Sequence, residues 1–116
     1  MIKDREYKAI LHIVQFIQDN LDKHYTIEEL ARRAGLNQRA LKSGFRMMYG
    51  MGVYAYLKKE RMNKAKEHLQ MTHQSIFQIA RMVGFKSISS FSNAFRKQFK
   101  QSPTDWRKGL IEWVEI

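Results

Sequence analysis

The chain of 116 residues carries a formal net charge of +10 at pH 7, contains 44% hydrophobic residues, and has one Pro and no Cys. This hydrophobic content allows a folded core and excludes a wholly disordered chain, while the lack of Cys excludes disulfides, thiolate metal sites and cysteine nucleophiles. No apolar run is long enough to cross a bilayer, and the N-terminus, which mixes charged and apolar residues, does not have the pattern of a signal peptide.

The first predicted element is a helix over residues 6–23. Its apolar residues recur at a helical spacing and form one stripe, made of Ile10, Val14, Ile17 and Leu21. A helix with a single apolar stripe buries that stripe against a neighbour. We expect the neighbour to be the pair of helices that follows.

A helix-turn-helix pattern then occurs twice in the chain. The matched pairs, at an offset of 49 residues before the turn and 50 after it, are Ile27/Ile76, Leu30/Ile79, Ala31/Ala80, Ala34/Val83, Gly35/Gly84, Leu36/Phe85, Leu41/Phe91, Phe45/Phe95 and Arg46/Arg96. Each copy reads as a helix, a Gly-containing turn and a second helix. Gly35 and Gly84 stand where a chain that leaves a helix sharply often needs a left-handed residue.

Capping residues mark the helix starts in both copies. The spacing of a capping box is met by Thr26 with Glu29 and by Ser75 with Gln78, which predicts helix starts at residues 27 and 76. The second helices are predicted to begin after the N-cap residues Asn37 and Ser87.

A helix predicted over residues 53–70, which contains no Pro or Gly, joins the two copies. Ser102 and Pro103 have the pattern of an N-cap followed by Pro at the first helical position, so they start a last helix. We therefore expect an all-α protein of about seven helices. Its parts are a first helix-turn-helix subdomain over residues 1–52, a linker helix over 53–70 and a second helix-turn-helix subdomain over 71–116.

The positive charge is concentrated on the predicted second helices. No acidic residue occurs from Asn37 to Lys59 or from His68 to Thr104, and these gaps cover both helices. An acid-free basic face on a folded domain is typical of a surface that binds a polyanion. A solubilising basic surface usually intersperses both signs, and a membrane-surface helix does not explain the duplicated turn, so both alternatives rank below nucleic acid.

The second copy resembles a known family. The string I-x-x-I-A-x-x-V-G-F-x-S-x-S-x-F-S-x-x-F-R, from Ile76 to Arg96, is similar to the signature of the AraC/XylS transcription regulators, and Ser102-Pro103 with Trp106-Arg107 is similar to its closing element. The resemblance covers about residues 8–108. It implies two helix-turn-helix units joined by one long helix, with each second helix offered to a major groove on the same side of the duplex.

The resemblance also implies the DNA-binding residues. In the first unit these are Asn37, Gln38, Arg39, Lys42, Ser43 and Arg46, and in the second unit Ser87, Ile88, Ser89, Ser90, Asn93, Arg96 and Lys97. By the geometry of base edges, Arg39 suits guanine, Asn93 or Gln38 suits adenine, and Ile88 suits a thymine methyl. Arg46, Arg96 and Lys97 are expected on phosphates. For Ile88 and Ser90, core packing or simple exposure stays an equal alternative.

Four positions depart from the family pattern, namely Ser43, where the family often has Arg, Gly44, Val53, which stands where the second copy has Pro103, and Lys100. Gly44 lies inside the second helix of the first unit, where it costs roughly 1 kcal/mol relative to Ala, so that helix is expected to be the weaker one. Lys100 stands in the second unit where the first has Gly50. The four His residues show no metal-ligand spacing, and we expect no metal or other cofactor.

The leading hypothesis is a sequence-specific, double-stranded DNA-binding domain of a bacterial transcription regulator, which is not an enzyme and acts in the cytoplasm. The expected partners are an operator duplex, RNA polymerase, and an effector or dimerisation domain on the N-terminal side; no membrane partner is expected. The alternative is a basic helical module that binds nucleic acid nonspecifically or docks a partner protein. Strong selectivity for one duplex sequence separates the two.

Overall fold

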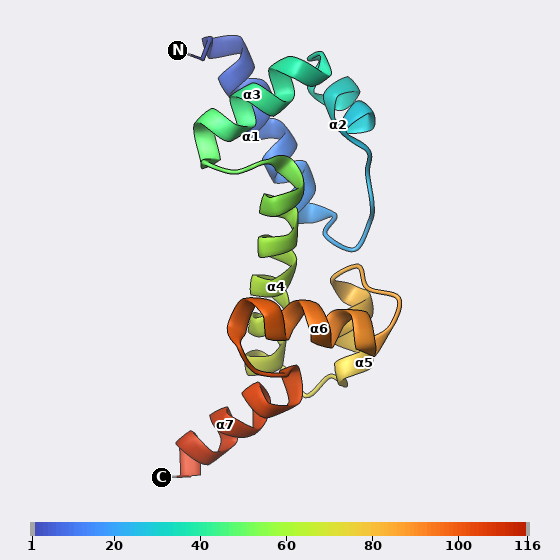
Figure 1. Cartoon of the computed structure of the whole chain (residues 1–116), viewed down its shortest axis with the longest axis vertical. Coiled ribbons are helices and arrows are strands. Elements are labelled where there is room, and N and C mark those ends of the chain that lie inside the picture. Colours follow the sequence, from blue (N-terminus) through green and yellow to red (C-terminus); the bar gives the residue numbers. More distant parts are fainter. Residues whose placement is uncertain (1, 116) are drawn as a thin grey trace. The chain divides into compact units, whose positions relative to one another are not determined.

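The computed structural model describes the backbone of residues 2–115 and the side chains of residues 2–109. Within this range the chain forms seven helices and no strand, which confirms the predicted all-α fold (Figure 1). The helices are α1 (Asp4–Asp19), α2 (Ile27–Ala34), α3 (Gln38–Tyr49), α4 (Val53–Met71), α5 (Ile76–Met82), α6 (Ile88–Phe99) and α7 (Pro103–Glu115). None of the described helices is both long and apolar enough to span a bilayer.

The chain divides into two compact units, one over residues 1–58 and one over residues 59–116. The division lies inside α4, so each unit contains part of that helix. The predicted division at residues 52/53 and 70/71 stays a prediction.

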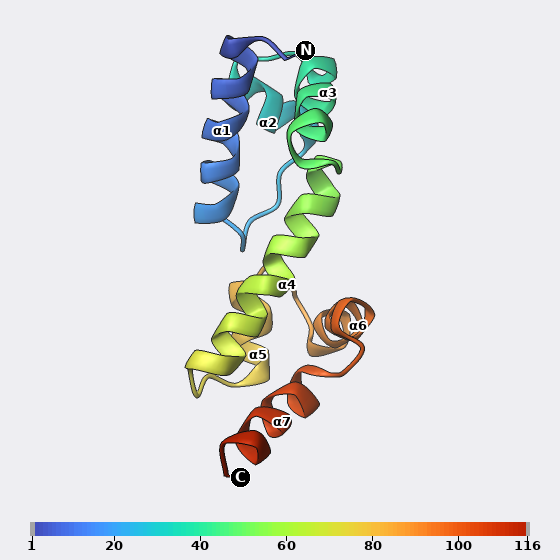
Figure 2. The ribbon, with the colours of Figure 1, turned by 90° about the vertical axis from the view of Figure 1, so that its left-hand side faces the viewer.

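The first unit packs α1, α2 and α3 around one core, to which the start of α4 contributes. Within this unit α1 and α3 run side by side, as Figure 2 shows. The buried residues are Ile10, Ile13, Ile17, Leu21, Leu30, Ala31, Leu41, Phe45, Val53, Tyr56 and Leu57. Phe45 meets the Tyr56 ring edge-on at 5.3 Å between ring centroids, and the amide of Gln18 donates to the Tyr56 hydroxyl at 2.9 Å. These contacts tie α4 to α3 and α1.

The second unit repeats this arrangement with other residues. Its core is made of Met62, Ala65, Leu69, Ile79, Ala80, Val83, Phe91 and Phe95. The ammonium group of Lys66 lies 4.8 Å from the centroid of the Phe99 ring and 4.7 Å from that of Trp106. A cation over aromatic faces stabilises such packing, so Lys66 links α4 to both α6 and α7.

Helix α1 ends earlier than the sequence predicts. The apolar stripe suggests a helix as far as residue 23, but α1 stops at Asp19, and Asn20 has the non-helical angles φ −137° and ψ 40°. The side-chain amide of Asn20 donates to the Phe16 carbonyl at 2.9 Å. This bond satisfies a carbonyl that the end of a helix leaves without an intrahelical partner. Leu21 is nevertheless buried, as its place in the stripe predicts.

The turns of the two units are built in the same way. Gly35 and Gly84 have φ values of 70° and 92°, in the left-handed region that the sequence predicts for them. The residue after each glycine donates a backbone hydrogen bond to the preceding helix. The N–H of Leu36 donates to the Ala31 carbonyl at 3.0 Å, and the N–H of Phe85 donates to the Ala80 carbonyl at 2.9 Å. This six-to-one bond is the mark of a Schellman motif, which directs each chain into its second helix.

Candidate nucleic-acid interface

Helix α3 begins at an N-cap formed by Asn37. The side-chain oxygen of Asn37 accepts a bond from the backbone N–H of Ala40 at 2.8 Å. Ser87 has the same place before α6, where its hydroxyl accepts from the backbone N–H of Ser90 at 3.1 Å. Both helix starts predicted from the sequence are therefore confirmed, and equivalent residues of the two helices can be compared by their distance from the cap.

Ser87 and Ser90 are also bonded to each other through their side chains. The Ser87 hydroxyl donates to the Ser90 hydroxyl at 3.0 Å while it accepts from the Ser90 backbone. These two hydroxyls therefore serve the start of α6. Ile88, which follows the cap, is 46% exposed, so core packing does not explain this residue.

One face of each helix is buried and the opposite face is open. Leu41 and Phe45 in α3, and Phe91 and Phe95 in α6, are each 0% exposed. All residues predicted to bind DNA are exposed, namely Asn37, Gln38, Arg39, Lys42, Ser43, Arg46, Ser87, Ile88, Ser89, Ser90, Asn93, Arg96 and Lys97. The structure thus places them on surfaces that a duplex can reach.

An open depression brings together most of the predicted residues of the first unit. Its lining consists of Gln38, Arg39, Lys42, Ser43 and Arg46. The predicted residues of the second unit lie along the exposed face of α6.

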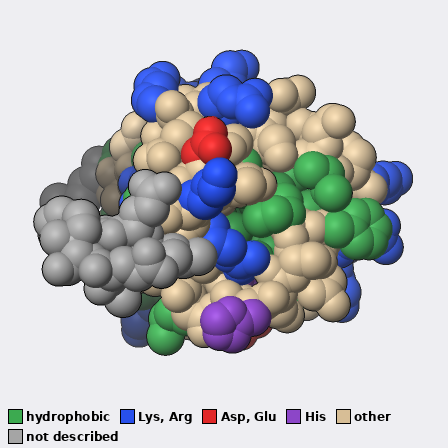
Figure 3. Space-filling model, turned by 90° about the horizontal axis from the view of Figure 1, so that it is seen from below, with side chains coloured by type: hydrophobic (Ala, Val, Ile, Leu, Met, Phe, Trp, Pro, Cys, Tyr) green, Lys and Arg blue, Asp and Glu red, His purple; other side chains and the backbone are tan. Residues whose placement is uncertain are grey.

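Among residues 2–109, no carboxylate is recorded in an ion pair with a cation of α3 or α6. The described ion pairs Lys8–Asp4, Arg32–Glu28 and Lys64–Glu67 all lie outside α3 and α6. On the face seen in Figure 3, Lys and Arg side chains are spread over several places, whereas acidic side chains are visible mainly in one small area. Unpaired cations on a fixed surface attract phosphates.

Gly44 has a packing role that the sequence does not reveal. It is buried, and a Cβ built on it would overlap the Cδ1 of Ile10 and lie 3.0 Å from the Cδ1 of Ile2. Both side chains come from the segment that contains α1. The glycine therefore permits α1 to approach α3 closely.

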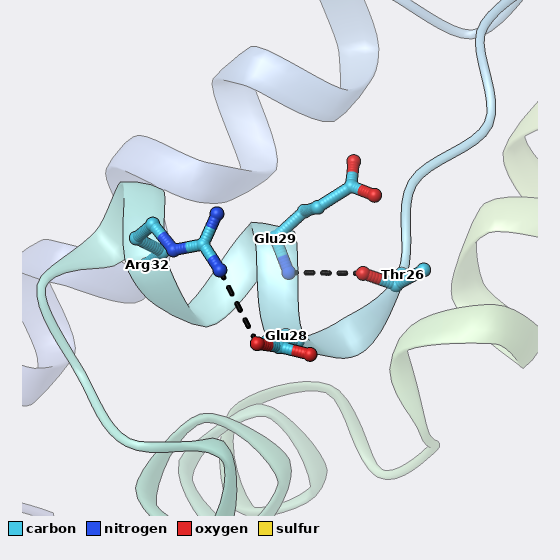
Figure 4. A network of polar contacts seen from close by, with 4 residues as sticks. All are labelled: Thr26, Glu28, Glu29 and Arg32. Carbon is cyan, nitrogen blue, oxygen red and sulfur yellow. Dashed lines mark hydrogen bonds and ion pairs between the residues drawn. The ribbon is translucent and has the colours of Figure 1, made fainter.

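The two predicted capping boxes differ in the structure. Ser75 and Gln78 form both bonds of the box, at 3.1 Å and 2.9 Å. At the start of α2 the Thr26 hydroxyl accepts from the backbone N–H of Glu29 at 3.0 Å, and this is the one bond that joins the two residues in Figure 4. The cap and the helix start predicted at Thr26 are therefore confirmed, whereas the reciprocal bond of the box is not among the described contacts.

Arg107 makes three polar contacts to backbone far away in the sequence, and sequence reasoning assigned it no role. Its guanidinium donates to the backbone carbonyls of Leu69, Thr72 and Gln74 at 3.2, 3.2 and 2.6 Å. These carbonyls lie at the end of α4 and in the loop before α5. Arg107, which belongs to α7, thus holds the loop that precedes the second helix-turn-helix.

Other chemistry is not supported by the described side chains. Among them no group of three or more His, Asp or Glu residues is placed to hold a metal ion. Burial raises the pKa of the Tyr49 hydroxyl, and the phenols of Tyr56 and Tyr7 add to this effect. The last residue of α3 therefore stays neutral near pH 7, and the charge of that helix comes from its Arg and Lys side chains.

The layout of two matched helix-turn-helix units agrees with known proteins. A family model described as a helix-turn-helix domain matches residues 30–109. The regulatory protein SoxS of Escherichia coli strain K12 is 30% identical over 103 residues, which are 89% of this chain and 96% of SoxS. The chain belongs to the AraC/XylS family of transcription regulators.

Solved structures of AraC-type domains have the same fold. A transcriptional regulator with an AraC-type DNA-binding domain from Chromobacterium violaceum is 28% identical, with a TM-score of 0.80 over 87% of this chain and 90% of that one. The DNA-binding domain of AdpA, solved in complex with a target DNA, is 26% identical, with a TM-score of 0.82 over 87% of this chain and 91% of that one. The AraC/XylS assignment confirms the predicted family and fold, and with them the prediction that the chain is not an enzyme.

Proposed function

We propose that this AraC/XylS chain is a sequence-specific, double-stranded DNA-binding domain in which α3 and α6 each enter a major groove. The observation that carries the proposal is the matched construction of the two helices. Each begins at a side-chain cap, buries its fourth and eighth residues, and exposes a face with cations but without carboxylates. A helix of this kind fits a major groove, where its N-terminal residues meet base edges.

The residues proposed for base edges are those of the first turns, and the residues proposed for phosphates lie further along. Gln38, Arg39, Lys42 and Ser43 have the first role in α3, and Ile88, Ser89, Ser90 and Asn93 have it in α6. Arg46, Arg96 and Lys97 are proposed to hold phosphates, together with the helix N-termini that Asn37 and Ser87 cap.

A competing function is a basic module that binds nucleic acid without selectivity or docks a protein. Selection from a random duplex library with the purified chain, followed by sequencing, separates the two. Two short enriched boxes about one helical turn apart, roughly 34 Å along the duplex, are the expected result. One enriched box means that a single helix reads bases. A library without any enriched sequence overturns the proposal and leaves the nonspecific module.

The wider context rests on the family resemblance. We infer that the chain acts on operators in the bacterial cytoplasm, on one side of the duplex, and that RNA polymerase and an effector or dimerisation domain are its protein partners. Transcription from an operator-containing template, with and without the chain, tests the first part. A change in transcript level that a scrambled operator abolishes is the expected result, and its sign distinguishes activation from repression.

A further inference from the structure

Lys100 closes α6 in a backbone conformation that side chains rarely adopt. It lies directly after α6, in the turn that leads to α7 (Figure 1), with φ 65° and ψ 14°. Among the described residues it is the one residue other than glycine with a positive φ. A Cβ in this left-handed region crowds a neighbouring carbonyl oxygen, whereas glycine has no Cβ to crowd. Lys100 therefore lowers the stability of the second unit relative to glycine.

The first unit builds the same helix end with glycine. Gly50 has φ 71° and ψ 9°, and its N–H donates to the Arg46 carbonyl at 2.8 Å. The N–H of Lys100 donates to the Arg96 carbonyl at 2.8 Å as well. The two ends are thus equivalent left-handed caps, and the fold does not require a side chain at this place. A strained residue that the fold does not require points to a function of its side chain.

The contacts of the Lys100 side chain within the protein do not explain the strain. Its ammonium donates to the Lys97 carbonyl at 3.3 Å, in an exposed position. Water competes for both groups of such a bond, so the bond contributes little to stability. A cation also suits the negative end of a helix dipole, but Arg96 and Lys97 already provide cations in the last turn of α6. The bond nevertheless shows that the ammonium lies over this last turn.

Lys100 thereby adds a third cation to the end of α6. The side chains of Arg96, Lys97 and Lys100 are all exposed. No acidic residue occurs from His68 to Thr104, and the described ion pairs all lie outside α6. Like charges held this close together repel one another, and a bound polyanion relieves the repulsion.

We propose that Lys100 binds a phosphate of the duplex backbone and forms, with Arg96 and Lys97, a three-cation site at the end of α6. The inference rests on the proposed DNA-binding function and deepens it. The three matching positions at the end of α3 supply one cation, Arg46. The end of α6 is therefore the end that holds the backbone more strongly, and the strained cap is what places its third cation there.

The chemistry of the side chain fits a phosphate better than a base. An ammonium on a flexible four-carbon chain has three donors and no acceptor, so it can follow a phosphate oxygen without a fixed angle. Lys100 also follows the whole 12-residue length of α6. At 1.5 Å per residue, about 18 Å of helix separates it from the first turn, which is proposed for base edges. Lys100 should therefore raise the affinity for any duplex without changing the preferred sequence.

The test uses the full chain and the variants Lys100→Gly and Lys100→Arg with two duplexes, one selected from the random library and one scrambled. Lys100→Gly should bind both duplexes more weakly, by about 3- to 10-fold near ~0.1 M salt. Its slope of log affinity against log salt concentration should become shallower by about 0.9, the value for one phosphate contact. Lys100→Arg keeps the charge and should retain the affinity and the slope of the wild type.

Misfolding does not imitate this result, because Lys100→Gly should unfold at a higher temperature than the wild type while it binds more weakly. The matched control is Lys64→Ala, which removes an exposed positive charge from the same unit. Lys64 pairs with Glu67 at 3.7 Å and lies outside α6. This control should keep the affinity and the salt slope of the wild type.

The outcomes separate this inference from the function on which it rests. If the wild-type chain enriches no sequence, the proposed function fails. If it does, but Lys100→Gly binds with unchanged affinity and slope, the function stands and the phosphate contact of Lys100 is overturned. The contact is also overturned if Lys100→Arg or Lys64→Ala loses as much as Lys100→Gly, or if the loss is confined to the selected duplex.

Discussion

Gly44 of α3 lies so close to Ile10 of α1 that a Cβ on the glycine would overlap the Cδ1 of the isoleucine. Ile10 is completely buried, so its side chain has little room to move. This contact lies on the buried side of α3, opposite its exposed face, and leaves no room for an additional methyl group. The order of α3 depends on this contact as well as on its cap.

We expect Gly44→Ala to lower the free energy of unfolding of the first unit by about 1–3 kcal/mol, because overpacking a tight core costs that amount. The gain in helix propensity, roughly 1 kcal/mol, works in the other direction. Urea unfolding followed by circular dichroism measures the balance. Ile10→Val removes the Cδ1 that the new methyl meets, so the double variant should be more stable than the sum of the two single effects. Strict additivity would contradict the contact.

Lys100 is the one residue other than glycine with a positive φ among the described residues, at 65°. A side chain in the left-handed conformation costs about 1–2 kcal/mol, whereas glycine adopts it freely. Lys100→Gly should therefore raise the free energy of unfolding of the second unit by about 1 kcal/mol, after allowance for the larger entropy of an unfolded glycine. Thermal unfolding of the variant checks this.

The first unit offers the reverse substitution as a matched control. Gly50 closes α3 at φ 71°, and a Cβ built on it meets nothing within 4 Å. Gly50→Ala should therefore destabilise by about 1 kcal/mol through the backbone alone. If both substitutions changed stability in the same direction, backbone strain at these caps would not be the reason.

Arg107→Lys should destabilise the second unit by about 2 kcal/mol while it keeps the charge. A single ammonium cannot replace a guanidinium that reaches the carbonyls of Leu69, Thr72 and Gln74 together. Amide hydrogen exchange should become faster in the loop over residues 72–75, which these bonds hold. Unchanged exchange in that loop would show that the three bonds contribute nothing there.

Arg96→Ala should weaken binding to all duplexes and leave the selected sequence unchanged, because Arg96 is proposed to contact a phosphate. The loss of one such contact lowers the slope of log affinity against log salt concentration by about 0.9. Titrations of a selected and a scrambled duplex at several salt concentrations measure this, with Arg32→Ala as the control. A loss confined to one base position would assign Arg96 to a base edge instead.

The sequence predicted the local features of this fold well because they depend on residues close together in the chain. The caps at Asn37 and Ser87, the glycine turns and the apolar faces of α3 and α6 all follow from spacing within about one dozen residues. The exposure of the predicted DNA-binding side chains followed from the same periodicity.

Features that join distant segments were not predictable in this way. Arg107 bonds to carbonyls between 33 and 38 residues earlier in the chain. Gly44 was expected only to weaken its helix, because its role in packing depends on Ile10, which lies in another helix. The end of α1 also escaped prediction, because the apolar stripe continues past Asn20 while the backbone does not.

The spacing of buried residues in α4 repeats the spacing found in α1. Met62, Ala65 and Leu69 repeat the spacing of Ile10, Ile13 and Ile17 in α1, while Val53 and Tyr56 begin α4 as Pro103 and Trp106 begin α7. Helix α4 is therefore both the last helix of the first four-helix module and the first helix of the second. Because each module has its own hydrophobic core, substitutions can change the exposed face of one second helix without loosening the core of the other module.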